Sequence, residues 1–161
     1  GSGPYVANGD SPCTNKALTP LAPGTEGGLR VGGYQPQPDP PFGTGGASLA
    51  AAVIKPVSFF AVPFGISTNP TDPQTGRKVP VPSITIVGKK LTADLSAVSV
   101  SWNGQHFNQG APKPGGDGDA VGTYDGATGR YALDWTSVIK GGPFNGFIGV
   151  WHFEGAFRAS A

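Results

Sequence analysis

Residues 98–109 read VSVSWNGQHFNQ, and this stretch decides the fold class. Two alternating apolar and polar runs flank Asn103 and Gly104. Asn-Gly in this position is the strongest short-range signal for a β-hairpin, because a type I′ turn needs positive φ at both central residues. A second hairpin is predicted over residues 122–135, where Gly129 suits the left-handed position that closes the turn. We therefore expect a chain built from antiparallel strands.

Further short strands are predicted on both sides of these hairpins. They cover residues 48–54, 57–67, 83–87 and 147–158. Pro63 cannot donate a hydrogen bond to a sheet ladder, so strand 57–67 is expected at a sheet edge or with a bulge. No segment of eleven or more residues both lacks Gly and Pro and carries apolar residues at the three-and-four spacing of an amphipathic helix. The fold class that follows is all-β, an antiparallel β-sandwich or small barrel of about seven to eight strands.

The chain divides into two parts of different composition. Residues 1–46 are rich in Gly and Pro, whereas residues 47–161 hold most of the aromatic residues and all three Trp. Aromatic side chains dominate packed cores, and Pro-rich chain favours extended structure. We therefore expect an extended Gly/Pro-rich N-terminal arm over 1–46 and an antiparallel β-domain over 47–161.

The charge pattern argues against several classes of partner. Only 13% of residues are charged, against about 25% in typical soluble domains, and the formal net charge is +1. No basic face is visible, so neither nucleic acid nor an anionic membrane is expected. No apolar run reaches the roughly 20 residues of a transmembrane helix. We predict a protein partner, either another copy of the chain or a different surface protein.

The arm carries apolar side chains that are spaced as anchors. Leu29, Val31, Tyr34 and Phe42 are expected to lie across a sheet of the same chain or of a neighbouring subunit, the alternative being a disordered linker. Cys13 is the only cysteine, so it is either a bystander thiol or a link to another chain. Donating an extended segment to another subunit's sheet edge is a route to fibres and sheaths, so the arm is expected to make subunit contacts.

Two groups of polar residues are candidate chemical sites. Asp117, Asp119 and Asp125 lie in or near a Gly-rich loop and offer the hard oxygen ligands that calcium prefers, although Asp also favours turns. His152 and Glu154 share one strand face and could serve acid–base chemistry, the alternative being a solvated surface pair. Motifs for a nucleophile elbow, a zinc helix or a phosphate loop are missing. We therefore expect a non-enzymatic protein, with calcium the only cofactor to consider.

Trp102 and Trp151 are candidate ligand-facing aromatics, because β-sandwich binding modules can stack sugars on exposed Trp rings. Strand alternation places Trp151 on the same face as Phe153 and Phe157, however, and this favours a place in the core. A carbohydrate-binding or adhesin module is the alternative that these residues keep open.

The C-terminal part of the chain resembles a group of known proteins. The similarity rests on VGTYDGATGRYALDW, GGPFNGF and WHFEG, with WNG and FNQG upstream, and covers roughly the last 70 residues. It is to small exported bacterial β-rich proteins of the PEP-CTERM surface-sorting type, whose function is unknown. The resemblance implies export to the extracellular space or cell surface, with the periplasm as an alternative, and it transfers no catalytic residue.

These observations predict an exported, non-enzymatic structural or assembly subunit of an extracellular filament, sheath or surface complex, present as an oligomer and using its N-terminal arm for subunit contacts. The alternative is the carbohydrate-binding or adhesin module. A small hydrolase that uses His152 and Glu154 is the third and least favoured reading.

Overall fold

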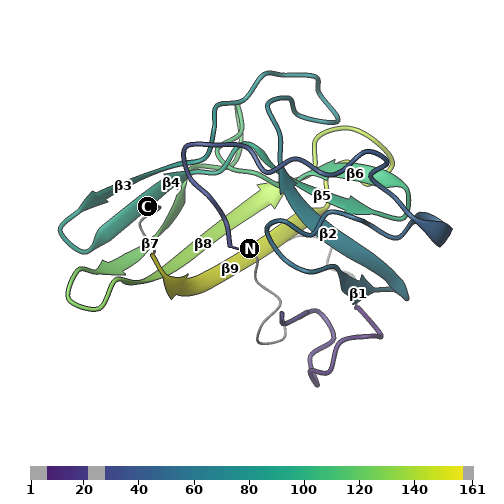
Figure 1. The fold of residues 1–161 in the computed structure, drawn as a ribbon, viewed down its shortest axis with the longest axis horizontal. Helices are drawn as coiled ribbons and strands as arrows, with labels where there is room; N and C mark the ends of the chain where they lie inside the picture. The colour runs from purple at the N-terminus through teal and green to yellow at the C-terminus, as the bar shows by residue number, and fades with distance from the viewer. Residues whose placement is uncertain (1–6, 22–27, 158–161) are drawn as a thin grey trace.

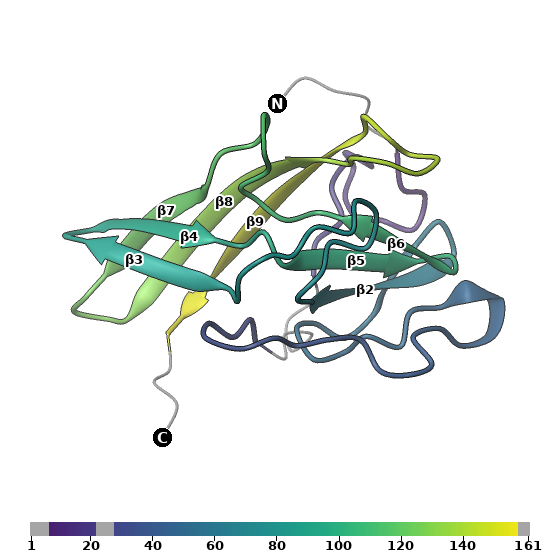
Figure 2. The ribbon, with the colours of Figure 1, turned by 90° about the horizontal axis from the view of Figure 1, so that it is seen from above.

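The computed structural model describes residues 7–21 and 28–157, and it shows two antiparallel sheets (Figures 1 and 2). The strands are β1 (Val57–Phe59), β2 (Val62–Thr68), β3 (Ser83–Val87), β4 (Lys90–Asp94), β5 (Val98–Trp102), β6 (Gln105–Asn108), β7 (Ala120–Asp125), β8 (Arg130–Val138) and β9 (Ile148–Ala156). One sheet has the order β1-β2-β5-β6 and the other β3-β4-β7-β8-β9. The predicted all-β sandwich is confirmed, and the small closed barrel is not formed.

Helical structure in the described residues is limited to one 3-10 turn, η1 (Thr44–Gly46). None of the described residues belongs to a helix that is long and apolar enough to cross a membrane.

Local turn chemistry places both predicted hairpins correctly. Asn103 and Gly104 join β5 to β6 with φ values of 51° and 71°, as a type I′ turn requires. Gly129 has a φ of 73° and closes the loop between β7 and β8. A third hairpin, not predicted, joins β3 to β4 through a two-residue turn that begins at Gly88, with a φ of 62°. Left-handed backbone is accessible to Gly without strain, which explains why these turns are tight.

Two predicted strands differ in the structure. Residues 48–54 form no strand, and only Ser48 and Ile54 of this range make isolated bridges, that of Ser48 to Phe42. The chain over 57–67 is not one strand but the hairpin β1–β2, which turns at Phe60 and Ala61 with left-handed φ values of 49° and 61°. β2 lies between β1 and β5, so it is not a sheet edge, although the part containing Pro63 pairs with β1 alone.

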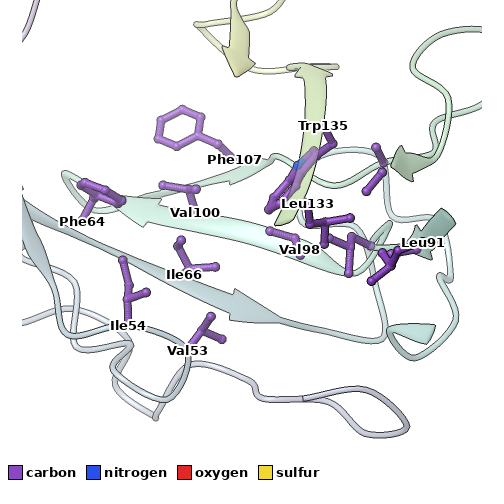
Figure 3. Packing of buried hydrophobic residues seen from close by; sticks show 14 residues of the cluster. Val53, Ile54, Phe64, Ile66, Leu91, Val98, Val100, Phe107, Leu133 and Trp135 are labelled. Atoms are coloured by element: carbon purple, nitrogen blue, oxygen red, sulfur yellow. The ribbon is translucent and has the colours of Figure 1, made fainter. Parts of the chain in front are cut away.

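The hydrophobic core lies between the two sheets (Figure 3). Val98 and Val100 of β5 lie between Ile66 of β2 and the β8 side chains Leu133 and Trp135, and all five are at most 9% exposed. Each of these side chains alternates with an outward-facing neighbour, as a strand period of two requires. Burying one such aliphatic side chain contributes about 1.5–3 kcal/mol.

The outer face of the four-stranded sheet is covered by the preceding chain. Gln35 and Thr68 exchange two hydrogen bonds, from the Thr68 N–H to the Gln35 carbonyl (2.9 Å) and from the Gln35 N–H to the Thr68 hydroxyl (2.6 Å). Further along β2, a Cβ atom on Gly65 would lie 2.3 Å from the Ala50 carbonyl oxygen. Residues 35–50 therefore form a third layer against β2, and Figure 2 shows this dark blue chain beside the sheet.

Candidate functional site

β3 forms one edge of the five-stranded sheet, and among the described residues no strand pairs with its outer side (Figure 2). Its sequence is Ser83 followed by the four β-branched residues ITIV. It contains no charge, no Pro and no Gly, the devices by which natural proteins usually protect an edge. Ile86 is 38% exposed and Val87 is 73% exposed. An uncharged, β-branched and open edge is a template for pairing with another strand.

The hydrogen-bonding groups of this edge follow from the register of the hairpin. Val87 pairs with Lys90 across the two-residue turn. In such a hairpin the flanking pair exchanges both backbone hydrogen bonds, and the pairs along the ladder then alternate. The N–H and C=O groups of Ile84 and Ile86 therefore point away from β4, to the open side.

The two faces of β3 differ. Ile84 packs against the core and Ile86 lies on the same face, near the hairpin tip. Ser83, Thr85 and Val87 lie on the opposite face, and all three are exposed. The inner face of the open edge is thus apolar, and the outer face is polar except for Val87.

The edge at β1 is protected by the N-terminal segment. The side chain of the fully buried Asn8 accepts a hydrogen bond from the Phe60 N–H (3.2 Å) and donates one to the Ser58 carbonyl (3.4 Å). The carboxylate of Asp10 accepts hydrogen bonds from the Ser58 hydroxyl and the Ala61 N–H, and these bonds lower the pKa of Asp10. Residues 8–10 therefore hold the β1–β2 turn and occupy its edge.

The remaining edges are less suited to pairing than β3. At β6, the Asn108 N–H donates to the Gln74 side chain (2.7 Å). β9 carries His152, Glu154 and two glycines, and charge and Gly both weaken an edge as a template. β3 is thus the edge whose composition favours strand addition.

The predicted arm residues mostly contact their own chain. Leu29 packs against the core, and the Tyr34 hydroxyl donates to the Val79 carbonyl (2.7 Å). The ring of Phe42 lies 5.0 Å from that of His106, centroid to centroid. These contacts lie within one chain, and a role of the arm residues in contacts between subunits stays a prediction.

Val31 and Cys13 are placed differently from those anchors. Val31 is 43% exposed, and Cys13 is a partly exposed free thiol whose backbone N–H donates to the Ser11 hydroxyl (3.2 Å). Neither side chain is enclosed in the core. Their role in subunit contacts stays a prediction.

The predicted calcium ligands do not come together. Asp117 and Asp119 line a shallow hollow of about 330 Å³ beside β8, where the Asp117 carboxylate accepts the Val138 N–H (2.8 Å). Asp125 lies at the other end of β7, roughly 17 Å along the strand, and caps its turn by accepting the Ala127 N–H (2.9 Å). Within residues 7–21 and 28–157, no three His, Cys, Asp or Glu side chains are grouped to hold a metal.

His152 belongs to an exposed ionic cluster. Its Nδ1 lies 2.6 Å from a carboxylate oxygen of Asp134, and its Nε2 lies 3.2 Å from one of Glu154. Asp134 faces His152 across β8–β9, so the sequence pattern of one strand could not identify it. The hydrogen bond to Asp134, followed by that to Glu154, raises the pKa of His152. Because both ring nitrogens face carboxylates, the arrangement favours a surface ion pair over acid–base chemistry on a substrate.

The tryptophans have their indole N–H groups committed inside the protein. Trp102 donates to the Phe59 carbonyl (2.7 Å), and Trp151 donates to the Gln109 side-chain oxygen (3.0 Å). Trp151 also stacks on Trp135 at 5.8 Å, and Trp135 donates to the Gln109 carbonyl (2.9 Å). Both predicted ligand-facing rings are half-buried. Gln109, which the sequence pattern did not single out, connects two of the three indoles.

A second hollow, of about 130 Å³, is lined by Lys113 and Lys140. Burial lowers the pKa of Lys113 to about 8. Its Nζ donates to the backbone and side-chain oxygens of Asn108 (2.8 and 3.0 Å) and to the Val138 carbonyl. The three protons of the ammonium group are thereby used to tie loops together, so Lys113 is a structural cross-link.

The geometry therefore defines an all-β sandwich with an open, uncharged edge strand. No protein-family model, curated protein or solved structure matches this chain.

Proposed function

We propose that the protein is an exported, non-enzymatic structural or assembly subunit of an extracellular filament, sheath or surface complex. The observation that carries the proposal is β3, whose five uncharged residues leave two pairs of backbone N–H and C=O groups open at the edge of a sheet. Strand addition at such an edge supplies backbone hydrogen bonds without any specialised pocket. Export itself rests on the resemblance of the C-terminal sequence.

The N-terminal arm supports this proposal in two ways. Its described residues occupy the β1 edge and pair with the end of β2 at Thr68, so association is directed to the other sheet. Leu18 and Val31 are 57% and 43% exposed, and they are the arm side chains offered for contacts between subunits.

The two other functions have weaker support. A sugar platform needs an open ring face, whereas Trp102 and Trp151 are half-buried with their N–H groups bonded internally. A hydrolase needs a ring nitrogen free to move a proton, whereas both nitrogens of His152 face carboxylates.

The test is the mass of the full chain in solution, measured by size-exclusion chromatography with light scattering over a range of concentrations. The wild type is expected to associate, and Ile86→Lys is expected to weaken association at least tenfold, because it places a charge on the open edge. Val121→Lys is the matched control, since Val121 is an exposed valine of the same sheet on the internal strand β7. A wild type that stays monomeric at high concentration would refute the proposal.

A further inference from the structure

We propose that β3 pairs with β3 of a second copy of this chain, antiparallel and centred on Thr85. The inference rests on the proposed function and names the partner that the open edge takes. Three observations support it: the direction of the open backbone groups of β3, the side chains of β3, and the charges on the neighbouring strand β4.

The alternating direction of the backbone N–H and C=O groups along β3 selects the register of the pairing. Only Ile84 and Ile86 direct their hydrogen-bonding groups to the open side, so a stable pairing must set these residues against each other. An antiparallel pairing centred on Thr85 places Ile84 of each copy opposite Ile86 of the other. Each of these two pairs exchanges two hydrogen bonds, so all the open groups of both strands are satisfied.

The neighbouring registers satisfy fewer groups. If the pairing is shifted by one residue, Ile84 and Ile86 each lie opposite a residue whose N–H and C=O groups already bond to β4. A pairing centred on Ile84 sets Ile86 against Pro82, which has no N–H and whose carbonyl already accepts the Gly32 N–H (2.8 Å). A pairing centred on Ile86 sets Ile84 against the turn glycine Gly88, whose φ of 62° lies outside the strand region.

Side chains on both faces of the paired β3 strands, called the joint below, are compatible with this register. On the inner face, Ile84 and Ile86 of the two copies meet and extend the core beyond Ile84, covering the exposed part of Ile86. On the outer face, Thr85 meets its own copy and Val87 meets Ser83 of the second copy. Pairs of β-branched side chains across strands stabilise a sheet, and the joint sets no like charges against each other.

The charges on β4 are complementary across the joint. Lys90 pairs with Val87 and Asp94 pairs with Ser83 on the same ladder. Because the two copies run in opposite directions, Lys90 of one copy lies at the same end of the joint as Asp94 of the other. Three strand spacings separate them, roughly 14 Å, so salt screens most of this attraction and its effect is to favour the antiparallel orientation at low ionic strength. A parallel pairing would instead align the lysines.

The product is a two-fold symmetric dimer with one continuous ten-stranded sheet. Such an isologous contact closes on itself and consumes the β3 edge. Under the proposed function this dimer is the building unit of the assembly, and growth beyond it uses another surface.

Cysteine cross-linking tests the register in the full chain, with Cys13→Ser as the background. Thr85→Cys is expected to form a disulfide-linked dimer under mild oxidation, because a non-hydrogen-bonded antiparallel pair brings its Cα atoms within disulfide reach. Thr123→Cys, exposed on the same face but on the internal strand β7, is the control and should remain largely monomeric. The yields are compared on non-reducing gels and by mass spectrometry.

A mixed sample gives the second measurement. Ser83→Cys and Val87→Cys should each cross-link poorly alone and at least fivefold better when mixed, since these positions face each other only in the register centred on Thr85. If light scattering shows association but both cross-linking results match the Thr123→Cys control, the dimer proposal is wrong and the proposed function stands. A monomeric wild type overturns both.

Discussion

Replacing Gln109 with Met tests whether the buried amide holds the two sheets together. The Gln109 side chain donates hydrogen bonds to the Asn108 and Ser137 carbonyls (3.0 and 3.3 Å) and accepts one from the Trp151 indole (3.0 Å). It is 4% exposed. Met is close to Gln in volume, so Gln109→Met removes these three hydrogen bonds without opening a large cavity.

The expected loss follows from the number of bonds. A net contribution of about 1 kcal/mol for each bond gives a loss of about 3 kcal/mol, of which the Trp151 N–H left without an acceptor accounts for about 1–2 kcal/mol. A domain of this size has a total stability of about 5–15 kcal/mol. The melting temperature should therefore fall by about 6–12 °C.

Urea unfolding followed by circular dichroism measures the free energy of unfolding. Gln105→Met, a half-buried glutamine at the end of the β5–β6 turn, is the control and should change it by less than about 0.5 kcal/mol. In a Trp151→Phe background, which removes the indole donor, Gln109→Met should cost about 1–2 kcal/mol less than in the wild type. A loss below about 1 kcal/mol, the same in both backgrounds, would refute the assigned role of the amide.

Two further predictions concern the five-stranded sheet. Gly122→Ala should lower the free energy of unfolding by about 2 kcal/mol or more, because the new Cβ would lie 1.8 Å from the Ala132 carbonyl oxygen. Gly126→Ala is the control and should be nearly neutral in the same urea assay, because its Cβ would meet no atom closer than 3.8 Å. The pKa of His152 is raised above its usual 6.5, mainly by the hydrogen bond to Asp134. The folded protein therefore gains stability that is fully present below pH 6.5 and is lost as the pH rises through the folded pKa. An imidazole titration by NMR should give a lower midpoint in Asp134→Asn, and equal midpoints would contradict this cause.

Features encoded by neighbouring residues could be predicted from the sequence. The β5–β6 hairpin depends only on Asn103, Gly104 and the alternation around them, so its position was predicted correctly. The turn at Phe60 and Ala61 was missed because Asn8 and Asp10 accept its backbone N–H groups from about fifty residues away. Two aromatic or small apolar residues carry no turn signal of their own.

The same distinction applies to the candidate sites. Alternation within β9 placed His152 and Glu154 on one face, but Asp134 joins them only through the register of β8 with β9. Asp117 and Asp125 are close in sequence, yet β7 separates them. The strand at 83–87 was predicted, whereas its position at an open edge depends on the strand order of the sheet, which no local pattern encodes.

The layer that the N-terminal chain adds over β2 also has a consequence for the order of folding. Gln35 finds its partner Thr68 33 residues later, and Asn8 reaches Phe60 across 52 residues. Closing loops of this length costs entropy before the contacts form, so local hairpins assemble sooner. As synthesis proceeds, residues 8–35 leave the ribosome before β1 and β2, and they can reach their final place only after these two strands exist.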